Sequence, residues 1–198
     1  MKRRVVVFDF DGTLTLKDTL LEFIKFTCGK TSFYKGFLLY LPMLVLMKLR
    51  LYPNWRAKEK IFGYFFKGWA LERFQSAGAT FANRIENFCN FDVLEMLSKH
   101  ISEGDKVYVI TASVEEWVRP WCRSKADVVV IGTQVETDSE GRINGRFKTK
   151  NCYGREKVNR LLLVEPDRKD YELYAYGDSR GDKEMIEYAD YGLYINKK

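Results

Sequence analysis

The chain has 198 residues, of which 46% are hydrophobic and 30% charged, and its net charge is +6. This composition excludes a disordered chain, and the length allows one α/β core with a sizeable additional unit. The four cysteines are widely spaced without a CxxC pair, and the first residues lack the pattern of a secretory signal. We therefore expect free thiols in the cytoplasm rather than disulfides or a zinc site.

The first hydrophobic stretch ends in acidic residues. Residues 5–8 (VVVF) are β-branched or aromatic, as in a strand buried on both faces of a parallel sheet. Asp9 and Asp11 follow, and Gly12 then frees the backbone to turn. Ligands of open α/β sheets bind at the carboxyl ends of the strands, where two acids repel each other unless a cation or a proton relieves them. The stretch predicts a metal ion, although alone it is also typical of a turn that closes a strand.

A helical segment follows this strand. Apolar residues recur at helical spacing over 20–26, 56–70 and 71–91. Gly29 is placed to end the first of these helices. No strand pattern occurs between about residues 16 and 100. We predict a helical cap domain at 16–91, inserted into an α/β core formed by 1–15 and 92–198.

The predicted cap is basic and aromatic. Residues 16–70 contain ten Lys or Arg against three acidic residues, and 13 of the 30 aromatic residues of the chain. Within them, residues 37–47 (FLLYLPMLVLM) are the most hydrophobic part of the sequence, but they are half as long as the roughly 20 residues of a membrane span, and Pro42 interrupts them. Two interpretations remain: a buried helix of the cap, or an interfacial face whose flanking basic residues meet acidic lipid head groups.

The second half of the chain alternates strands with helices, which predicts a doubly wound parallel sheet. The predicted strands are 107–110, 128–131, 173–176 and 191–195, and the predicted helices are 115–125, 155–164 and 182–188. Turn signals within residues 134–148 indicate a hairpin, which we place at the edge of the sheet.

Polar residues follow three of the predicted strands, and parallel strand ends lie at one edge of a sheet. These residues are Asp9 and Asp11, then Thr111 and Ser113, then Asp178 and Asp182. Four carboxylates in one crevice require a divalent cation, and an all-oxygen site suits Mg²⁺. An anionic substrate would also need a cationic side chain, for which Lys148, Lys150 and Lys157 are the candidates.

Taken together, these motifs resemble the haloacid dehalogenase superfamily, in particular its phosphatase branch typified by phosphoserine phosphatase. The motifs are DFDGTLT after the first strand, ITAS after the second, GREKV at the helix that contains Lys157, and GDSRGD after the strand at 173–176. They occur in the expected order and cover nearly all of the core. The resemblance selects Lys157 over the two other lysines.

The resemblance implies a two-step phosphoryl transfer through an aspartyl phosphate, in which Asp9 is the nucleophile and Asp11 the general acid and base. Mg²⁺ would be held by Asp9, Asp178 and the main-chain carbonyl of Asp11. The phosphoryl group would be bound by Thr111, Ala112 and Lys157, and the site would be supported by Gly12, Ser113 and Asp182.

The cap of this superfamily selects the substrate. Asp18 is the nearest equivalent of a glutamate that binds the ammonium group in phosphoserine phosphatases, and Gly181 replaces their asparagine. The hydrophobic, basic cap looks more like that of the phosphatidylglycerophosphatase C type. The expected substrate is therefore a small phosphorylated metabolite or a lipid phosphate, including lysophospholipids. A lipid substrate would bring the cap into peripheral contact with a membrane. The alternative is a catalytically inactive phosphate- or lipid-binding protein of the same fold. We expect no nucleic-acid partner, because aliphatic runs interleave with the basic residues.

Overall fold

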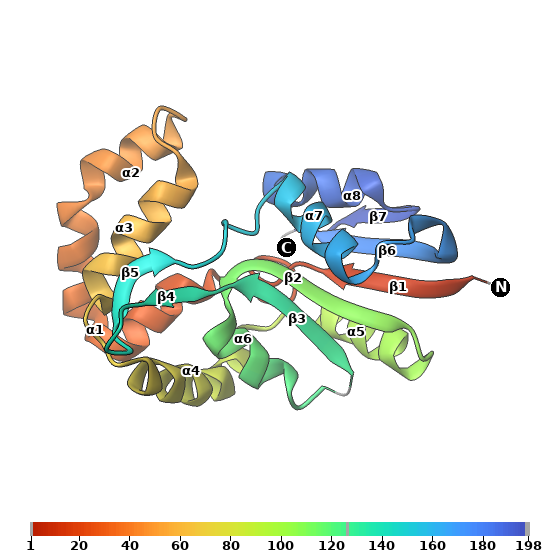
Figure 1. Cartoon of the computed structure of the whole chain (residues 1–198), viewed down its shortest axis with the longest axis horizontal. Coiled ribbons are helices and arrows are strands. Elements are labelled where there is room, and N and C mark those ends of the chain that lie inside the picture. The colour runs from red at the N-terminus through yellow and green to blue at the C-terminus, as the bar shows by residue number, and fades with distance from the viewer. Residues whose placement is uncertain (1, 126, 197–198) are drawn as a thin grey trace.

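The computed structural model describes residues 2–125 and 127–196. Within them, five parallel strands form one sheet in the order β3-β2-β1-β6-β7, and a helical insertion follows β1 (Figure 1). This confirms the predicted α/β fold with a doubly wound parallel sheet and a helical cap. The strands are β1 (Arg3–Phe8), β2 (Lys106–Val114), β3 (Val128–Thr133), β6 (Tyr171–Gly177) and β7 (Tyr191–Tyr194).

β1 lies at the centre of the sheet, between β2 and β6, and both of its faces are covered. Its residues 5–8 are completely buried, as their continuous hydrophobic run predicts. Phe8 is aligned with Val109 of β2 and with Tyr176 of β6. The segments that leave β1 and β6 therefore start at the same edge of the sheet, next to the last residues of β2.

Helices cover the two faces of the sheet. Val6 and Phe8 belong to a hydrophobic cluster with α5 (Phe91–Ser102) and α6 (Glu115–Cys122), whereas Val5 and Val7 pack with α7 (Arg155–Val164) and α8 (Lys183–Tyr188). Figure 1 shows these two helix pairs on opposite sides of the strands. Alternate side chains of one strand thus enter two separate cores.

The helical insertion, which we call the cap, consists of α1 (Thr19–Leu39), α2 (Leu41–Lys48), α3 (Asn54–Phe66) and α4 (Leu71–Ile85). Gly29 interrupts α1 with a positive φ of 79°, and the chain then resumes a helical course. The Phe23 ring of α1 stacks on Trp117 of α6, with 4.6 Å between the ring centroids. Cap and core therefore share one continuous hydrophobic cluster.

The interpretation of residues 37–47 as a buried helix is wrong. α2 has no buried residue among its eight, and Pro42 lies in its first turn, where a proline is compatible with the helix. The sequence pattern could not show this, because a hydrophobic run looks the same whether its side chains are covered or exposed. None of the described helices is long and apolar enough to cross a bilayer.

The hairpin is also misplaced in the sequence-based prediction. β4 (Val135–Thr137) and β5 (Ile143–Phe147) form a separate two-stranded sheet, which packs against the cap instead of the edge of the main sheet. Phe147 contacts Phe62 of α3 with 4.9 Å between ring centroids, and Gly63 and Gly145 bring the two backbones into close contact. Glycine pairs allow such an approach because neither has a Cβ.

Candidate active site

Asp9 and Lys157 form a buried ion pair at the carboxyl end of β1. Lys157 Nζ lies 2.6 Å from Asp9 Oδ1 and 2.5 Å from Asp182 Oδ1, and the lysine side chain is only 2% exposed. Burial alone would lower the pKa of Lys157, but the two carboxylates outweigh this effect and hold the pKa above its ordinary value. A permanently charged ammonium group is therefore fixed beside Asp9.

Asp182 holds this lysine and the loop after β6. Its Oδ2 atom accepts hydrogen bonds from the main-chain N–H groups of Asp178 and Ser179 at 3.2 and 3.0 Å, and from the Ser179 hydroxyl at 2.9 Å. Although burial opposes ionisation of Asp182, Lys157 and the Ser179 hydrogen bonds keep its pKa below the usual range. Both oxygens already have partners within the protein, so Asp182 has a supporting position.

Asp9 and Asp178 place carboxylate oxygens at adjacent strand ends. Together with Asp182, these residues offer three carboxylate oxygens that all lie within 4.8 Å of one another. Gly12 has a φ of +83°, and a Cβ at this position would overlap the Asp178 carboxylate. Burial raises the pKa of Asp9 to about 7, although Lys157 opposes the shift. A dication would offset the free-energy cost of burying the charged Asp9 carboxylate, so the oxygen ligands of Asp9 and Asp178 fit Mg²⁺.

Asp11 is held by hydrogen bonds from the first turn of α1 and from the segment at the end of β2. Its Oδ1 atom accepts from the Thr19 N–H and hydroxyl, and its Oδ2 atom accepts from the Ser113 hydroxyl. Burial, and then the negative charge of Asp18, raise the pKa of Asp11 to about 6, against the effect of these hydrogen bonds. Asp11 can therefore carry or release a proton near neutral pH, as a general acid and base requires.

Two of the predicted phosphate-binding residues, Thr111 and Ala112, lie where β2 loses regular pairing with β3, between Ile110 and Val114, whereas the third, Lys157, lies on α7. Ala112 lines the pocket above Asp9, whereas Thr111 and Ser113 are buried. The Thr111 hydroxyl accepts a hydrogen bond from the Ser113 N–H at 2.9 Å. The Thr111 hydroxyl thus bonds within the irregular segment between Ile110 and Val114. The hydroxyl that reaches Asp11 is that of Ser113.

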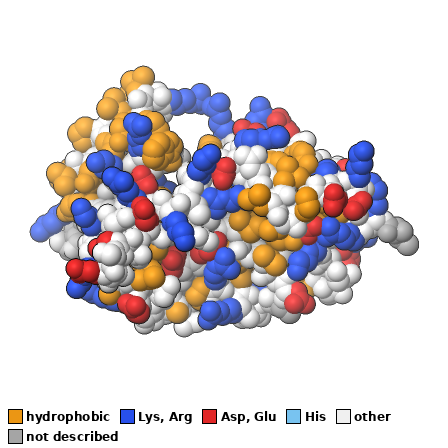
Figure 2. Space-filling view, viewed as in Figure 1, with side chains coloured by type: hydrophobic (Ala, Val, Ile, Leu, Met, Phe, Trp, Pro, Cys, Tyr) orange, Lys and Arg blue, Asp and Glu red, His pale blue; other side chains and the backbone are white. Residues whose placement is uncertain are grey.

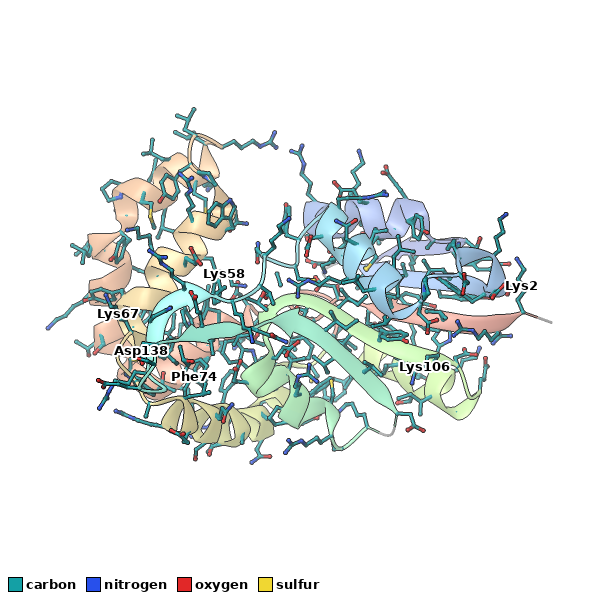
Figure 3. The ribbon with its side chains drawn as sticks, viewed as in Figure 1. Lys2, Lys58, Lys67, Phe74, Lys106 and Asp138 are labelled. Carbon is teal, nitrogen blue, oxygen red and sulfur yellow. The ribbon has the colours of Figure 1, made fainter. Side chains whose placement is uncertain are left out.

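Lys58 of the cap also reaches the site, which the sequence analysis did not anticipate. Figure 3 shows Lys58 on the part of α3 that faces the core. Its Nζ atom donates to the Ala112 carbonyl at 2.5 Å, and burial lowers its pKa although Asp18, Asp11 and Asp9 oppose this shift. The one indication in the sequence was the position of Lys58 between Ala57 and Ile61, whose side chains both face inward.

These groups surround a pocket of about 330 Å³ between cap and core. The core side is polar and includes Asp9, Asp11, Lys157 and Ser179. The cap side combines Asp18 and Lys58 with an apolar wall formed by Leu20, Leu21, Phe37, Leu44, Met47, Ala57 and Ile61. The structure therefore brings Asp9, Asp11, Asp182 and Lys157 together under an apolar roof, and Asp178 lies close to Asp9 and Asp182 outside the lining of the pocket. Neither Lys148 nor Lys150 lines this pocket.

A parallel sheet with a cap after β1, and paired carboxylates with a buried lysine at the strand ends, define the class of the protein. The sequence pattern of the haloacid dehalogenase-like hydrolases matches residues 6–187, and the chain belongs to this family. Protein CicA of Caulobacter vibrioides is 34% identical over 191 residues, which cover 94% of this chain and 83% of that relative.

Solved structures of other proteins share the fold. A protein of unknown function from Bordetella pertussis Tohama I is 20% identical, with a TM-score of 0.80 over 96% of this chain and 88% of that one. A phosphoserine phosphatase, solved as a phospho-aspartyl intermediate analogue, is 18% identical, with a TM-score of 0.65 over 98% of this chain and 86% of that one. This hydrolase thus has phosphatase-like structural neighbours.

Proposed function

We propose that this protein is a Mg²⁺-dependent phosphomonoester hydrolase that acts through an aspartyl phosphate on Asp9. The observation that carries the proposal is the Asp9 carboxylate fixed 2.6 Å from the buried ammonium group of Lys157, with Asp11 beside the same pocket. Lys157 offsets the negative charge that attack on a phosphate brings together. The phospho-aspartyl analogue of the structural neighbour, phosphoserine phosphatase, supports this choice of intermediate.

In the first step, an Asp9 oxygen attacks phosphorus while the bond from phosphorus to the alcohol oxygen breaks. Asp11 gives its proton to that oxygen, and Lys157 faces the phosphoryl group. In the second step, Asp11 takes a proton from water, the water oxygen attacks phosphorus, and the bond to Asp9 breaks to release inorganic phosphate. Mg²⁺ held by Asp9, Asp178 and the main-chain carbonyl of Asp11 would neutralise the phosphoryl oxygens.

For the substrate, we propose a small phosphorylated metabolite or a lipid phosphate. The apolar roof of the pocket, with Phe37, Leu44 and Met47, supports an organic group with hydrocarbon surface. Lys58 and Asp18 add one charge of each sign on the cap side. A screen of phosphorylated metabolites and lysophospholipid phosphates, read as released phosphate, distinguishes the two classes.

The test of the reaction is the Asp9→Asn variant. It should lose hydrolysis of p-nitrophenyl phosphate by at least about a thousandfold, because the amide is not a nucleophile. The matched control is Asp167→Asn, a change of the same size at an exposed position, which should keep full activity. Turnover by Asp9→Asn close to that of the control would rule out the proposed reaction.

A further inference from the structure

The end of the cap carries apolar side chains that the protein leaves uncovered. Seven aliphatic residues around α2 are 43–73% exposed, and we call them the apolar tip: Leu38, Leu39, Leu41, Val45, Leu46, Leu49 and Leu51. Figure 2 shows hydrophobic side chains gathered over this end of the cap. Scattered exposed leucines are normal, but a contiguous group on one short helix and its flanks marks an interaction surface.

The stretch of sequence that contains the apolar tip has charge of one sign. No Asp or Glu occurs between Glu22 and Glu59, whereas this interval contains seven Lys or Arg. Five of the basic side chains are exposed, namely Lys30, Lys35, Lys48, Arg50 and Arg56. A partner that covers the tip must therefore bring negative charge to the edge of an apolar contact.

Aromatic residues with a polar end lie beside the apolar tip. Tyr34, Trp55 and Tyr64 are each about half exposed or more, and the Arg56 guanidinium lies over the Trp55 ring. Tyrosine and tryptophan are typical of the boundary between hydrocarbon and water, where the ring is buried and the polar atom stays wet.

We propose that the apolar tip docks the protein on the surface of an anionic lipid bilayer. α2 has eight residues and is too short to span, so it would lie in the head-group region with its aliphatic side chains inserted and the surrounding Lys and Arg on acidic head groups. A second copy of the chain fits less well, because a symmetric contact through this tip would face one basic surface with another.

Docking here has a consequence for the active site. Leu44 and Met47 belong to α2, yet they line the pocket above Asp9. The same helix therefore has one side toward the pocket and the other toward the bilayer. The docking itself does not rest on the proposed function. Only the action of the docked protein on phosphomonoesters at the membrane surface rests on it.

The test is co-sedimentation of the full chain with vesicles of phosphatidylcholine, with and without phosphatidylglycerol. The protein should sediment with the anionic vesicles and be released by salt. Leu46→Asp with Leu49→Asp should weaken binding by at least about tenfold, because two inserted aliphatic groups are lost. Leu163→Asp with Val164→Asp, which likewise replaces two exposed aliphatic side chains by aspartate but on α7, should bind as the unchanged protein does.

Basic residues and catalysis are tested separately. Lys48→Gln and Arg50→Gln should each weaken binding to anionic vesicles by about fivefold. Asp9→Asn should bind normally, so a failure of hydrolysis does not imitate a failure of docking. The proposal is overturned if the protein stays in the supernatant with anionic vesicles. It is also overturned if the Leu46 and Leu49 changes abolish a dimer in sedimentation velocity while leaving vesicle binding intact.

Discussion

Thr19 donates two hydrogen bonds to the same oxygen of Asp11, from its main-chain N–H at 3.0 Å and from its hydroxyl at 2.7 Å. The Thr19 hydroxyl oxygen in turn accepts a hydrogen bond from Trp117 Nε1 at 2.9 Å. The first turn of the cap and a helix of the core thus jointly orient the proposed acid–base residue.

Thr19→Val should lower kcat by about tenfold with little change in KM, because it removes a hydrogen bond to Asp11 without changing the side-chain shape. Loss of a bond to the carboxylate also raises the pKa of Asp11, so the activity limb near pH 6 should move to higher pH. Thr19→Ser restores the hydroxyl and should restore the profile. An unchanged pH profile in Thr19→Val would contradict this positioning role.

Gly12→Ala should destabilise the fold and abolish activity. Alanine at a φ of +83° costs about 1–2 kcal/mol, and its Cβ would also displace Asp178. Gly104→Ala is the matched control, because Gly104 has a φ of +77° and open space around it. The control should show a similar decrease in melting temperature from backbone strain, but it should keep full hydrolysis of p-nitrophenyl phosphate.

Stability of the metal-free protein should fall as the pH rises through about 7. Burial raises the pKa of Asp9 to about 7 and that of Asp11 to about 6, above their ordinary value of 3.8. The folded state therefore binds more protons than the unfolded state, and its advantage is full below about pH 4 and lost by about pH 8, on the order of a few kcal/mol. Thermal unfolding in EDTA measures this, and Asp9→Asn should remove the part of the dependence that Asp9 contributes and leave the part from Asp11.

Removal of divalent ions should stop hydrolysis. EDTA should abolish turnover and Mg²⁺ should restore it, whereas Ca²⁺ should restore it poorly because its larger, looser coordination misplaces the nucleophile. Mg²⁺ should also raise the melting temperature more at pH 8 than at pH 5, because Asp9 is ionised at pH 8 and can bind the cation. Equal activity in EDTA and in Mg²⁺ would contradict the assigned cofactor.

Lys58→Met should raise KM for phosphomonoesters by about tenfold, because it removes an ammonium group from the cap side of the pocket. Lys60→Met is the control, since Lys60 lies on the same helix and is exposed. Steady-state kinetics of both variants separates a role at the pocket from a general effect of charge.

The sequence was informative where local pattern and chemistry coincide. The VVVF run predicts a central strand, and the acids that follow it lie together because parallel strands end at one edge. Lys157 could be chosen over Lys148 and Lys150 only through the family resemblance, because the spacing alone placed all three near the site. Lys58 was missed because its approach to Ala112 depends on how the cap sits on the core. The exposure of α2 was missed for a similar reason, since burial depends on neighbours that periodicity does not contain.

The hairpin has a consequence for motion of the cap. Gly68 N–H donates to the Ile143 carbonyl, and Ile143 N–H donates to the Trp69 carbonyl, both at 2.8 Å, so the hairpin is joined to the cap by backbone hydrogen bonds. The polypeptide therefore crosses between the two bodies four times, twice beside the helical insertion and twice beside the hairpin. A hinge rotation must bend all four crossings at once, and one of them leads from β5 directly into the helix that bears Lys157.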